Sequence, residues 1–445
     1  MTPALRTGVS AGRGGLPTHG SRWRLELVLI CAGLFLASSD RLLAVDLGGL
    51  TVKPSFVLLG GAAVLVGARA VVAPGRPLRP AIPGLLPMIS ALIGVYLIAS
   101  TTADSKILAT TQMVVIVGGA LMPLLAIGFG LRSRLDLQRG LSAYLAGTLT
   151  AATFGYYQFA AAPLALPIPA GLAYDGVVDG VGRISAWAYE PAFYVFHLEL
   201  ALAVSIADVL AGRKRFGVRP EVPAAYLLFS LVLASARIGF LSLPVMVLLV
   251  MRASSSRRRL DPRAVKMVRL VVAGALATAV VGLPFGVNVP VYVANRVVSI
   301  TNTQEAESNA VRVGLYQTEM ELAQQRPILG YGPGNIGIEL VQRIPAYAGA
   351  PPQSAPANNL LLQAVLDAGL VALFLTTGVL LIVGRSMLTS PSRDTRILMA
   401  GVLTICLVNA QTASLFWDLR LWTAIALAVA AARVHQLDPA DPEGR

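Results

Sequence analysis

The stretch LLLQAVLDAGLVALFLTTGVLLIV, residues 360–383, decides the fold class of this chain. It holds one charged side chain, Asp367, and it is longer than the roughly 20 apolar residues that cross a bilayer as a helix. The whole chain has the same character, because 55% of its 445 residues are hydrophobic and only 13% are charged. Its mean hydropathy is +0.69. These values exclude a cytosolic enzyme and a disordered chain, and they predict an all-α polytopic membrane protein.

Similar apolar blocks recur along the chain and predict about 12 transmembrane helices. The seventh and eighth blocks are short and nearly continuous, so we interpret them as a hairpin or a broken pair around Arg237. A single transmembrane domain, 25–432, then lies between cytoplasmic tails at 1–24 and 433–445. The predicted spans are 25–45, 55–73, 82–100, 107–131, 141–162, 190–212, 222–236, 238–251, 270–288, 357–384, 397–415 and 421–432.

The net charge of +13 follows this topology. With the N-terminus inside, every short loop predicted to be cytoplasmic carries Lys or Arg, which is the positive-inside pattern. The charge therefore indicates membrane topology and not a nucleic-acid partner. A cleaved signal peptide within residues 1–45 is the alternative for the first block, but the phase of the later loops favours a retained span.

Metal and disulfide chemistry have little support in the composition. Cys31 and Cys406 both lie inside apolar blocks, and the chain has three histidines. This pattern predicts no disulfide framework and no zinc cluster. We expect neither a metal nor a cofactor.

The longest segment between predicted spans, 289–356, is expected to lie outside the membrane and to be functional, because long loops usually are. It contains a predicted amphipathic helix near 305–325, which Pro327 ends. One face of that helix carries Glu305, Arg312, Tyr316 and Glu319.

The run GYGPGN, 330–335, follows this helix. It is neither a Walker loop nor a dinucleotide fingerprint, because it lacks the required Lys and glycine spacing. We interpret it as a tight turn with exposed backbone N–H groups; the alternative is a plain turn that leads back to the membrane.

Three arginines fall on the predicted outer side, where the topology rule disfavours them: Arg183, Arg237 and Arg312. A charge within a span costs about 2.5–3.5 kcal/mol at the bilayer centre and less near the interface. Snorkelling to lipid headgroups, or an ordinary loop position, is one interpretation. A site for phosphate oxygens is the other, because the guanidinium fork suits them.

The start of the sixth span holds Glu190 before Pro191, and His197 lies two turns further along the same face. Glu190 is interpreted either as a carboxylate that favours a helix N-terminus or as a general base. His197 is either a second basic group or a histidine hydrogen-bonded inside the bundle. The tenth span opens with Asn358 and Asn359, which cap the helix or bind a sugar hydroxyl or a diphosphate oxygen.

In their order and spacing, these segments resemble the superfamily of bacterial O-antigen ligases and O-antigen or exopolysaccharide polymerases. Many ligases of this superfamily have a histidine where this chain has Asn358, so the resemblance implies that the role of base passes to another group, such as Glu190 or His197, or that the reaction uses no strong base. This departure favours a polymerase-type or divergent member. The segments that carry the resemblance are Arg183 with Glu190-Pro191, SARIG at 235–239, PILGYGPGN at 327–335, and NNLLLQ at 358–363 with Gly369.

The resemblance implies a GT-C-like fold in the bacterial inner membrane with an extracytoplasmic active site. It implies a metal-independent, inverting transfer of a saccharide from undecaprenyl diphosphate to a hydroxyl of a glycan or lipid-linked acceptor. Alternatives are a flippase, in which His197, Asp208 and Asp367 form a relay, and a non-catalytic envelope scaffold. The implied site comprises Glu190, His197 and Asn358 for catalysis, Arg183, Arg237 and Arg312 for the diphosphate, and Tyr316, Gly332, Gly334, Asn335 and Asn359 for other substrate contacts.

Overall fold

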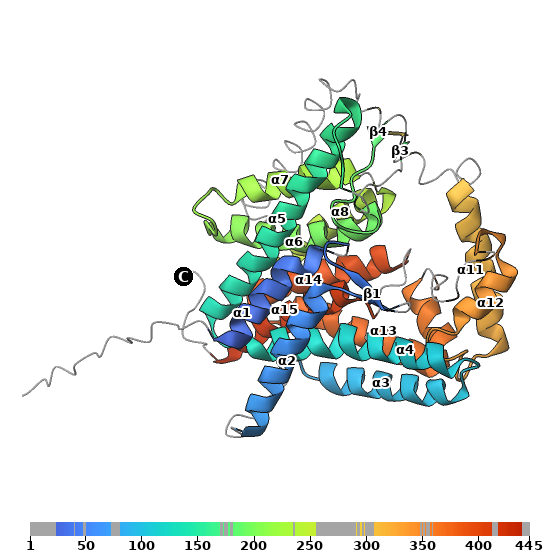
Figure 1. Cartoon of the computed structure of the whole chain (residues 1–445). Coiled ribbons are helices and arrows are strands. Elements are labelled where there is room, and N and C mark those ends of the chain that lie inside the picture. The colour runs from blue at the N-terminus through green and yellow to red at the C-terminus, as the bar shows by residue number, and fades with distance from the viewer. Residues whose placement is uncertain are drawn as a thin grey trace, which may run out of the picture.

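A computed structural model of the chain is all-α in the part that it describes, apart from two short antiparallel hairpins (Figure 1). Strand β1 (Val45–Leu47) pairs with β2 (Leu50–Val52), and β3 (Val177–Val178) pairs with β4 (Val181–Gly182). The described residues are 24–39, 41–47, 50–72, 81–169, 172, 177–178, 181–234, 236–254, 291, 294–295, 298, 307–347, 349, 352, 357, 359–411 and 417–437.

The helices follow the apolar blocks of the sequence. They are α1 (Leu25–Phe35), α2 (Pro54–Val72), α3 (Leu85–Thr102), α4 (Lys106–Ile116), α5 (Arg134–Leu164), α6 (Pro191–Ala211), α7 (Glu221–Ala234), α8 (Arg237–Ser254), α11 (Glu307–Gln325), α12 (Ile336–Arg343), α13 (Leu360–Thr389), α14 (Arg393–Leu407) and α15 (Leu419–Leu437). Two π-helical turns, η2 (Val117–Leu121) and η3 (Leu124–Phe129), continue α4, and a 3₁₀ turn, η7 (Asn409–Gln411), follows α14.

Among the described residues, 6 helices are long and apolar enough to cross a membrane, which supports a polytopic membrane protein. They are α2, α3, the segment Lys106–Phe129, α6, α8 and α13. The apolar helices Leu25–Ser38 and Glu221–Ala234 are shorter. The count of twelve spans stays a prediction, and the predicted span at 270–288 lies outside the described residues.

Two predicted span ends differ from the structure, and one predicted break agrees with it. The first helical block ends at Ser38 and not at residue 45, because the chain turns there and the Arg41 N–H donates to the carbonyl of Trp187 at 2.9 Å. The span predicted to reach residue 415 ends at Leu407, where η7 begins to bond to other helices. The predicted break around Arg237 is confirmed, since α7 ends at Ala234 and α8 begins at Arg237.

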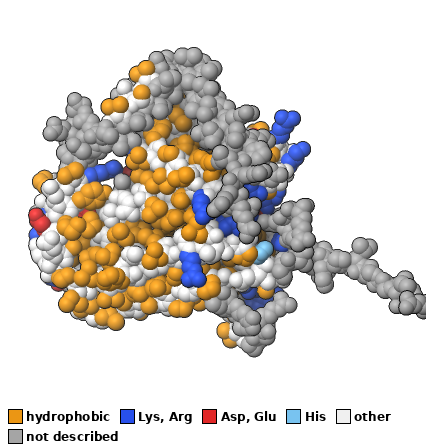
Figure 2. Space-filling view, turned by 180° about the vertical axis from the view of Figure 1, so that it is seen from behind, with side chains coloured by type: hydrophobic (Ala, Val, Ile, Leu, Met, Phe, Trp, Pro, Cys, Tyr) orange, Lys and Arg blue, Asp and Glu red, His pale blue; other side chains and the backbone are white. Residues whose placement is uncertain are grey.

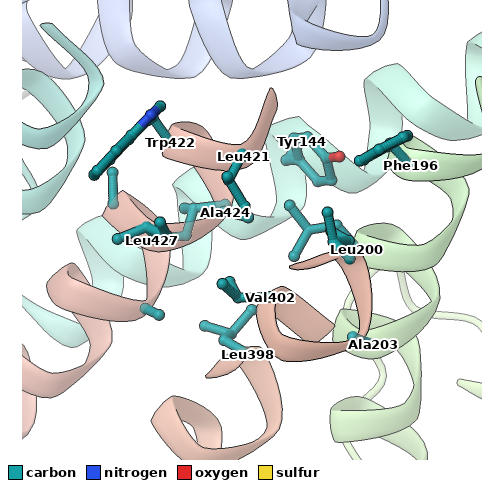
Figure 3. Close-up of a cluster of buried hydrophobic side chains, with 14 of the residues drawn as sticks. Tyr144, Phe196, Leu200, Ala203, Leu398, Val402, Leu421, Trp422, Ala424 and Leu427 are labelled. Atoms are coloured by element: carbon teal, nitrogen blue, oxygen red, sulfur yellow. The ribbon is translucent and has the colours of Figure 1, made fainter. Parts of the chain in front are cut away.

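The centre of the bundle is formed by α6 and α15, with α5 and α14 packed beside them (Figure 3). In α6, 94% of the apolar window is buried, against 28% in α2 and in α3, so the latter two lie at the outside. Figure 2 shows hydrophobic side chains spread over a broad face of the molecule. Such a surface suits a lipid solvent. The residues labelled in Figure 3 are Tyr144, Phe196, Leu200, Ala203, Leu398, Val402, Leu421, Trp422, Ala424 and Leu427.

Polar contacts divide the bundle into two ends. One end, here called the basic end, carries ion pairs between loops predicted to be cytoplasmic, such as Arg213 with Asp394 and Arg24 with Asp136. The other end carries α11 and α12 (Figure 1) and is called the α11 end. The turn between α3 and α4 and the turn η7 also lie at the α11 end, because Ser105 bonds to Asn335 and Gln411 bonds to Tyr316. The candidate site residues belong mostly to the α11 end.

Candidate functional site

The 3₁₀ turn η7 joins the elements that carry the predicted site. The hydroxyl of Tyr316, on α11, donates to the carbonyl of Gln411 at 2.7 Å. The amide of Asn359, at the start of α13, donates to Gln411 Oε1 at 2.9 Å. Helix α8 also packs against η7. We call this meeting point the η7 junction; Gln411 was not singled out by the sequence analysis, because it lay inside a predicted apolar span.

Asn359 caps α13, which is one of the two roles that the sequence suggested for it. Its Oδ1 accepts hydrogen bonds from the backbone N–H groups of Leu361 at 2.9 Å and Leu362 at 3.1 Å. The same side chain therefore both stabilises the helix start and ties it to η7. Asn358 lies outside the described residues.

The buried carboxylate of Glu199 lies next to the η7 junction. Glu199, on α6, is 0% exposed and accepts hydrogen bonds from Ser242 Oγ on α8 and from Asn409 Nδ2 on η7, the latter at 2.5 Å. A buried carboxylate is tolerated only when donors satisfy it. Glu199 thus connects α6, α8 and η7, and a carboxylate within an apolar span is the sequence signal that could have identified it.

Arg237 is the first residue of α8, and its side chain is half-buried. It precedes by five positions Ser242, which bonds to Glu199. The start of α8 is therefore held at the same place as Tyr316 and Asn359. These three predicted site residues lie on elements that meet at the η7 junction.

Helix α11 covers most of the segment near 305–325 that was predicted to be helical, but its predicted polar face is not uniformly exposed. Leu315 and Leu322 are buried against the underlying residues, while Arg312 is exposed. Burial raises the pKa of the Tyr316 phenol, and the nearby charge of Arg312 partly opposes this. Glu319 is buried on the same helix. Arg312 and Tyr316 are thus neighbours, as the spacing predicted, whereas Glu305 lies outside the described residues.

The glycine run forms the predicted tight turn, with positive φ values of 62°, 87° and 71° at Gly330, Gly332 and Gly334. L-amino acids other than glycine rarely adopt this conformation. The expectation of exposed N–H groups is wrong, because the Tyr331 N–H donates to the Leu366 carbonyl at 2.7 Å. The Gly334 N–H donates to Asp367 Oδ1 at 3.3 Å.

These bonds are possible because α13 is broken. Ala368 and Gly369 have non-helical angles, with φ of −148° and 78°. The break frees backbone groups that need partners inside a membrane protein. The Leu370 N–H donates to the Pro327 carbonyl at 2.8 Å. Hydrogen bonds therefore connect the break in α13 to the glycine run and to the residues just before it.

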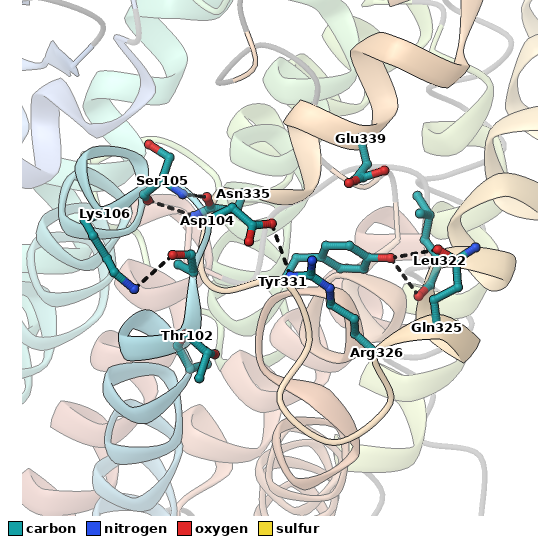
Figure 4. A network of polar contacts seen from close by, with 12 residues as sticks. Thr102, Asp104, Ser105, Lys106, Leu322, Gln325, Arg326, Tyr331, Asn335 and Glu339 are labelled. Atoms are coloured by element: carbon teal, nitrogen blue, oxygen red, sulfur yellow. Dashed lines mark hydrogen bonds and ion pairs between the residues drawn. The ribbon is translucent and has the colours of Figure 1, made fainter.

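Asn335 fastens the other side of the glycine run to the turn between α3 and α4 (Figure 4). Its Oδ1 accepts from the Ser105 N–H at 2.7 Å and its Nδ2 donates to the Ser105 carbonyl at 3.2 Å. Asp104 pairs with Arg326 at 3.1 Å in the same region. Asn335 is 2% exposed, so its amide, like the glycine backbone, contacts protein and connects α11 and α12 to the bundle.

The two proposed basic groups of α6 have different surroundings. Glu190 is exposed directly before α6. His197 is 1% exposed, and its Nδ1 lies 3.2 Å from the hydroxyl of Tyr144 on α5. The interpretation of His197 as a hydrogen-bonded histidine inside the bundle is therefore confirmed. Arg183 follows β4 and is half-buried.

The relay of the flippase alternative is not formed. Asp208 pairs with Arg215 at the basic end, with distances of 2.6 and 2.8 Å. Asp367 bonds to the glycine run at the α11 end. The two carboxylates therefore serve separate contacts, and His197 contacts Tyr144 instead.

The ion pair between Arg420 and Asp418 was not predicted, because the last span was predicted to begin only at residue 421. Arg420 binds Asp418 through Nε and Nη2, at 2.6 Å each, and lies over the ring of Phe193 at 4.3 Å. Burial by itself raises the pKa of Asp418, but the charge and hydrogen bonds of Arg420 hold it well below its usual range. This pair fixes the start of α15 against the start of α6.

The geometry offers arginine, tyrosine and amide side chains at one end of a helical bundle. No group of three or more His, Cys, Asp or Glu side chains among the described residues is arranged to hold a metal. Such a set suits recognition of anionic and hydroxyl groups.

Comparison with models of protein families matches residues 222–377 to the family described as O-antigen ligase. The match spans α7, α8, α11, α12 and the first part of α13, and so includes Arg237, Arg312 and Tyr316. No curated protein matches the chain. The match lies within the segment that carried the sequence resemblance, and it supports the resemblance to the superfamily of O-antigen ligases and polymerases.

Proposed function

We propose that this protein transfers or polymerises saccharide from an undecaprenyl-diphosphate-linked donor onto a hydroxyl of a glycan or other envelope acceptor. The reaction takes place at the outer face of the bacterial inner membrane, inverts the anomeric centre and needs no metal. One observation carries the proposal: α8, α11 and the first part of α13, which the family match covers, meet at the η7 junction. Arg237, Tyr316 and Asn359 are thereby held in one region of the molecule.

The diphosphate leaving group is the part of the substrate whose developing charge most needs stabilisation. Negative charge accumulates on the leaving diphosphate oxygen as the glycosidic bond breaks, and fixed cations lower the barrier when they are placed there beforehand. Arg237, Arg312 and Arg183 supply this charge in the proposed site. Tyr316 adds a phenol beside Arg312, and its bond to Gln411 holds α11 over the junction.

The acceptor hydroxyl attacks the anomeric carbon, the bond to the diphosphate breaks, and the hydroxyl proton passes to a base. Exposure supports Glu190 for this task over His197, which is enclosed beside Tyr144. Asn358, at the position of the family histidine, is proposed to bind the acceptor by its amide. A single displacement of this kind inverts the anomeric centre.

The glycine run acts indirectly in this scheme. Gly332, Gly334 and Asn335 are bonded or packed against α3, α4 and α13. They therefore set the position of α11, and with it that of Arg312 and Tyr316. Substrate binding is proposed to depend on these residues through that placement.

The test is a reconstituted assay with the full chain in liposomes, a lipid-linked oligosaccharide, and mass analysis of products. Lengthened or transferred glycan supports the proposal, with the same yield in the presence of a chelator. Movement of the lipid across the bilayer without a new glycosidic bond indicates a flippase and contradicts it. The absence of both a new glycan and lipid movement also contradicts the proposal and indicates a scaffold.

The assay is completed by the envelope glycans of a deletion strain. Loss of chain length indicates polymerisation, whereas accumulation of free lipid-linked polymer indicates failed ligation. Unchanged glycans contradict the proposal.

A further inference from the structure

At the basic end, three arginines converge on one carboxylate oxygen. Glu26 Oε1 lies 2.6 Å from Arg69 Nη1, 3.7 Å from Arg24 Nη1 and 4.0 Å from Arg132 Nη2. The arginines come from the segment before α1, the end of α2 and the turn before α5. Segments distant in the sequence are therefore folded to bring guanidinium groups together around Glu26.

A second carboxylate and a fourth arginine complete this cluster. Asp136 Oδ2 lies 2.7 Å from Arg24 Nη2. Arg433, near the end of α15, donates to the Phe129 carbonyl at 2.8 Å, and its charge acts on Arg132. We call the six residues Arg24, Glu26, Arg69, Arg132, Asp136 and Arg433 the basic cluster.

The basic cluster keeps an excess of positive charge, since four guanidinium groups face two carboxylates. Burial, and then the charges of Arg69 and Arg24, lower the pKa of Arg132, as expected where cations are crowded. Among the described residues, the carboxylate partners therefore leave part of the positive charge uncompensated.

The arginines face outward and the carboxylates lie beneath them. The side chains of Arg69 and Arg132 are 49% and 31% exposed, against 12% for Glu26. Apolar side chains are exposed on the adjoining helices, including Val64 and Val71 on α2 and Leu25 on α1. A cationic group at the end of an apolar helix surface matches a lipid, which has an anionic headgroup above acyl chains.

We propose that the basic cluster binds the phosphate headgroup of an anionic phospholipid, whose acyl chains lie on the exposed faces of α1 and α2. Arg69 and Arg132 contact the phosphate, for which the guanidinium fork is suited. Glu26 holds the arginines together and limits the affinity by its charge. A general excess of basic residues in cytoplasmic loops does not require that three of them share one buried oxygen.

The test measures lipid retention by the purified full chain in detergent, with native mass spectrometry and thermal unfolding. Phosphatidylglycerol is expected to be retained and to raise the unfolding temperature, and phosphatidylcholine with the same acyl chains is not. Arg69→Gln and Arg132→Gln are each expected to weaken retention about fivefold, the effect of one basic residue near a membrane surface. Arg385→Gln, an exposed arginine near the end of α13, is the matched control and leaves retention unchanged.

Glu26→Gln separates lipid binding from a purely structural role. It removes the central negative charge, so the protein without lipid becomes less stable while phosphatidylglycerol binds more tightly. If Glu26→Gln lowers both the stability and the binding of phosphatidylglycerol, that result contradicts the proposal. So does equal retention of the two lipids, equal retention by wild type and the Arg69→Gln/Arg132→Gln double variant, or full replacement of the lipid effect by inorganic phosphate.

Discussion

The basic end and the η7 junction use polar side chains in different ways. At the basic end, arginines meet carboxylates in charge-assisted pairs, such as Arg213 with Asp394 at 2.7 and 2.8 Å. At the junction, Tyr316, Gln411 and Asn359 bond through neutral hydroxyl, amide and carbonyl groups. Neutral partners position an element without cancelling the charge of an arginine beside it. The comparison teaches that the ion pairs of the basic end hold segments together, whereas the neutral bonds of the η7 junction leave the charge of a nearby arginine available for the proposed anionic substrate.

The largest effect is expected at the basic end. Asp208→Ala leaves the guanidinium of Arg215, which is 7% exposed, without its bidentate partner. Breaking a buried pair costs about 3–5 kcal/mol, so thermal unfolding in detergent should occur at a clearly lower temperature, while turnover per folded molecule is kept. Lys214→Ala, at an exposed neighbour, is the control. An unchanged unfolding temperature for Asp208→Ala would show that the pair does not hold this end together.

The next effect concerns rate and not stability. Arg237→Ala and Arg312→Ala each remove a cation proposed to stabilise the departing diphosphate, so the barrier should rise by roughly 2.7–4 kcal/mol, as for a lost oxyanion donor. Glycan extension in liposomes would fall about 100- to 1,000-fold. Arg343→Ala is a matched control, because that arginine pairs with Glu339 on α12 of the same end. Near-normal product from either variant removes the diphosphate role of that residue.

A smaller effect distinguishes the two residues of α6. Glu190→Gln should slow turnover about a hundredfold if its carboxylate takes the acceptor proton. His197→Gln should slow it less, because His197 is buried beside Tyr144. Initial rates with saturating donor test this order, with folded protein quantified for each variant. The reverse order would assign the base to His197.

The smallest effect tests the connection between the glycine run and α13. A Cβ at Gly369 would lie 1.8 Å from the Ile328 carbonyl oxygen, and φ there is 78°. Gly369→Ala should therefore cost about 1–3 kcal/mol of stability by overpacking and loosen α11, which lowers product formation as well. Gly384→Ala, in the same helix with open space around it, should be neutral. Equal stability of the two variants would contradict the described connection.

Much of the site was predictable from local patterns. A helix near 305–325 was predicted where the structure has one at 307–325, and the turn at 330–335 follows from its glycines. The bonding of Asn335 to Ser105 was not predictable, because 230 positions separate the two residues. The use of the glycine N–H groups by α13 was missed for the same reason.

The sequence by itself determined that this protein is a helical membrane protein and which family motifs it carries, since apolar block length and motif spacing are local properties. Only the tertiary structure decided that α13 breaks at Ala368 and Gly369, and that Glu199 satisfies donors from α8 and η7. A buried carboxylate or a freed backbone group must find a partner. Which partner it finds depends on how distant segments pack, and that information is absent from the periodicity of any single segment.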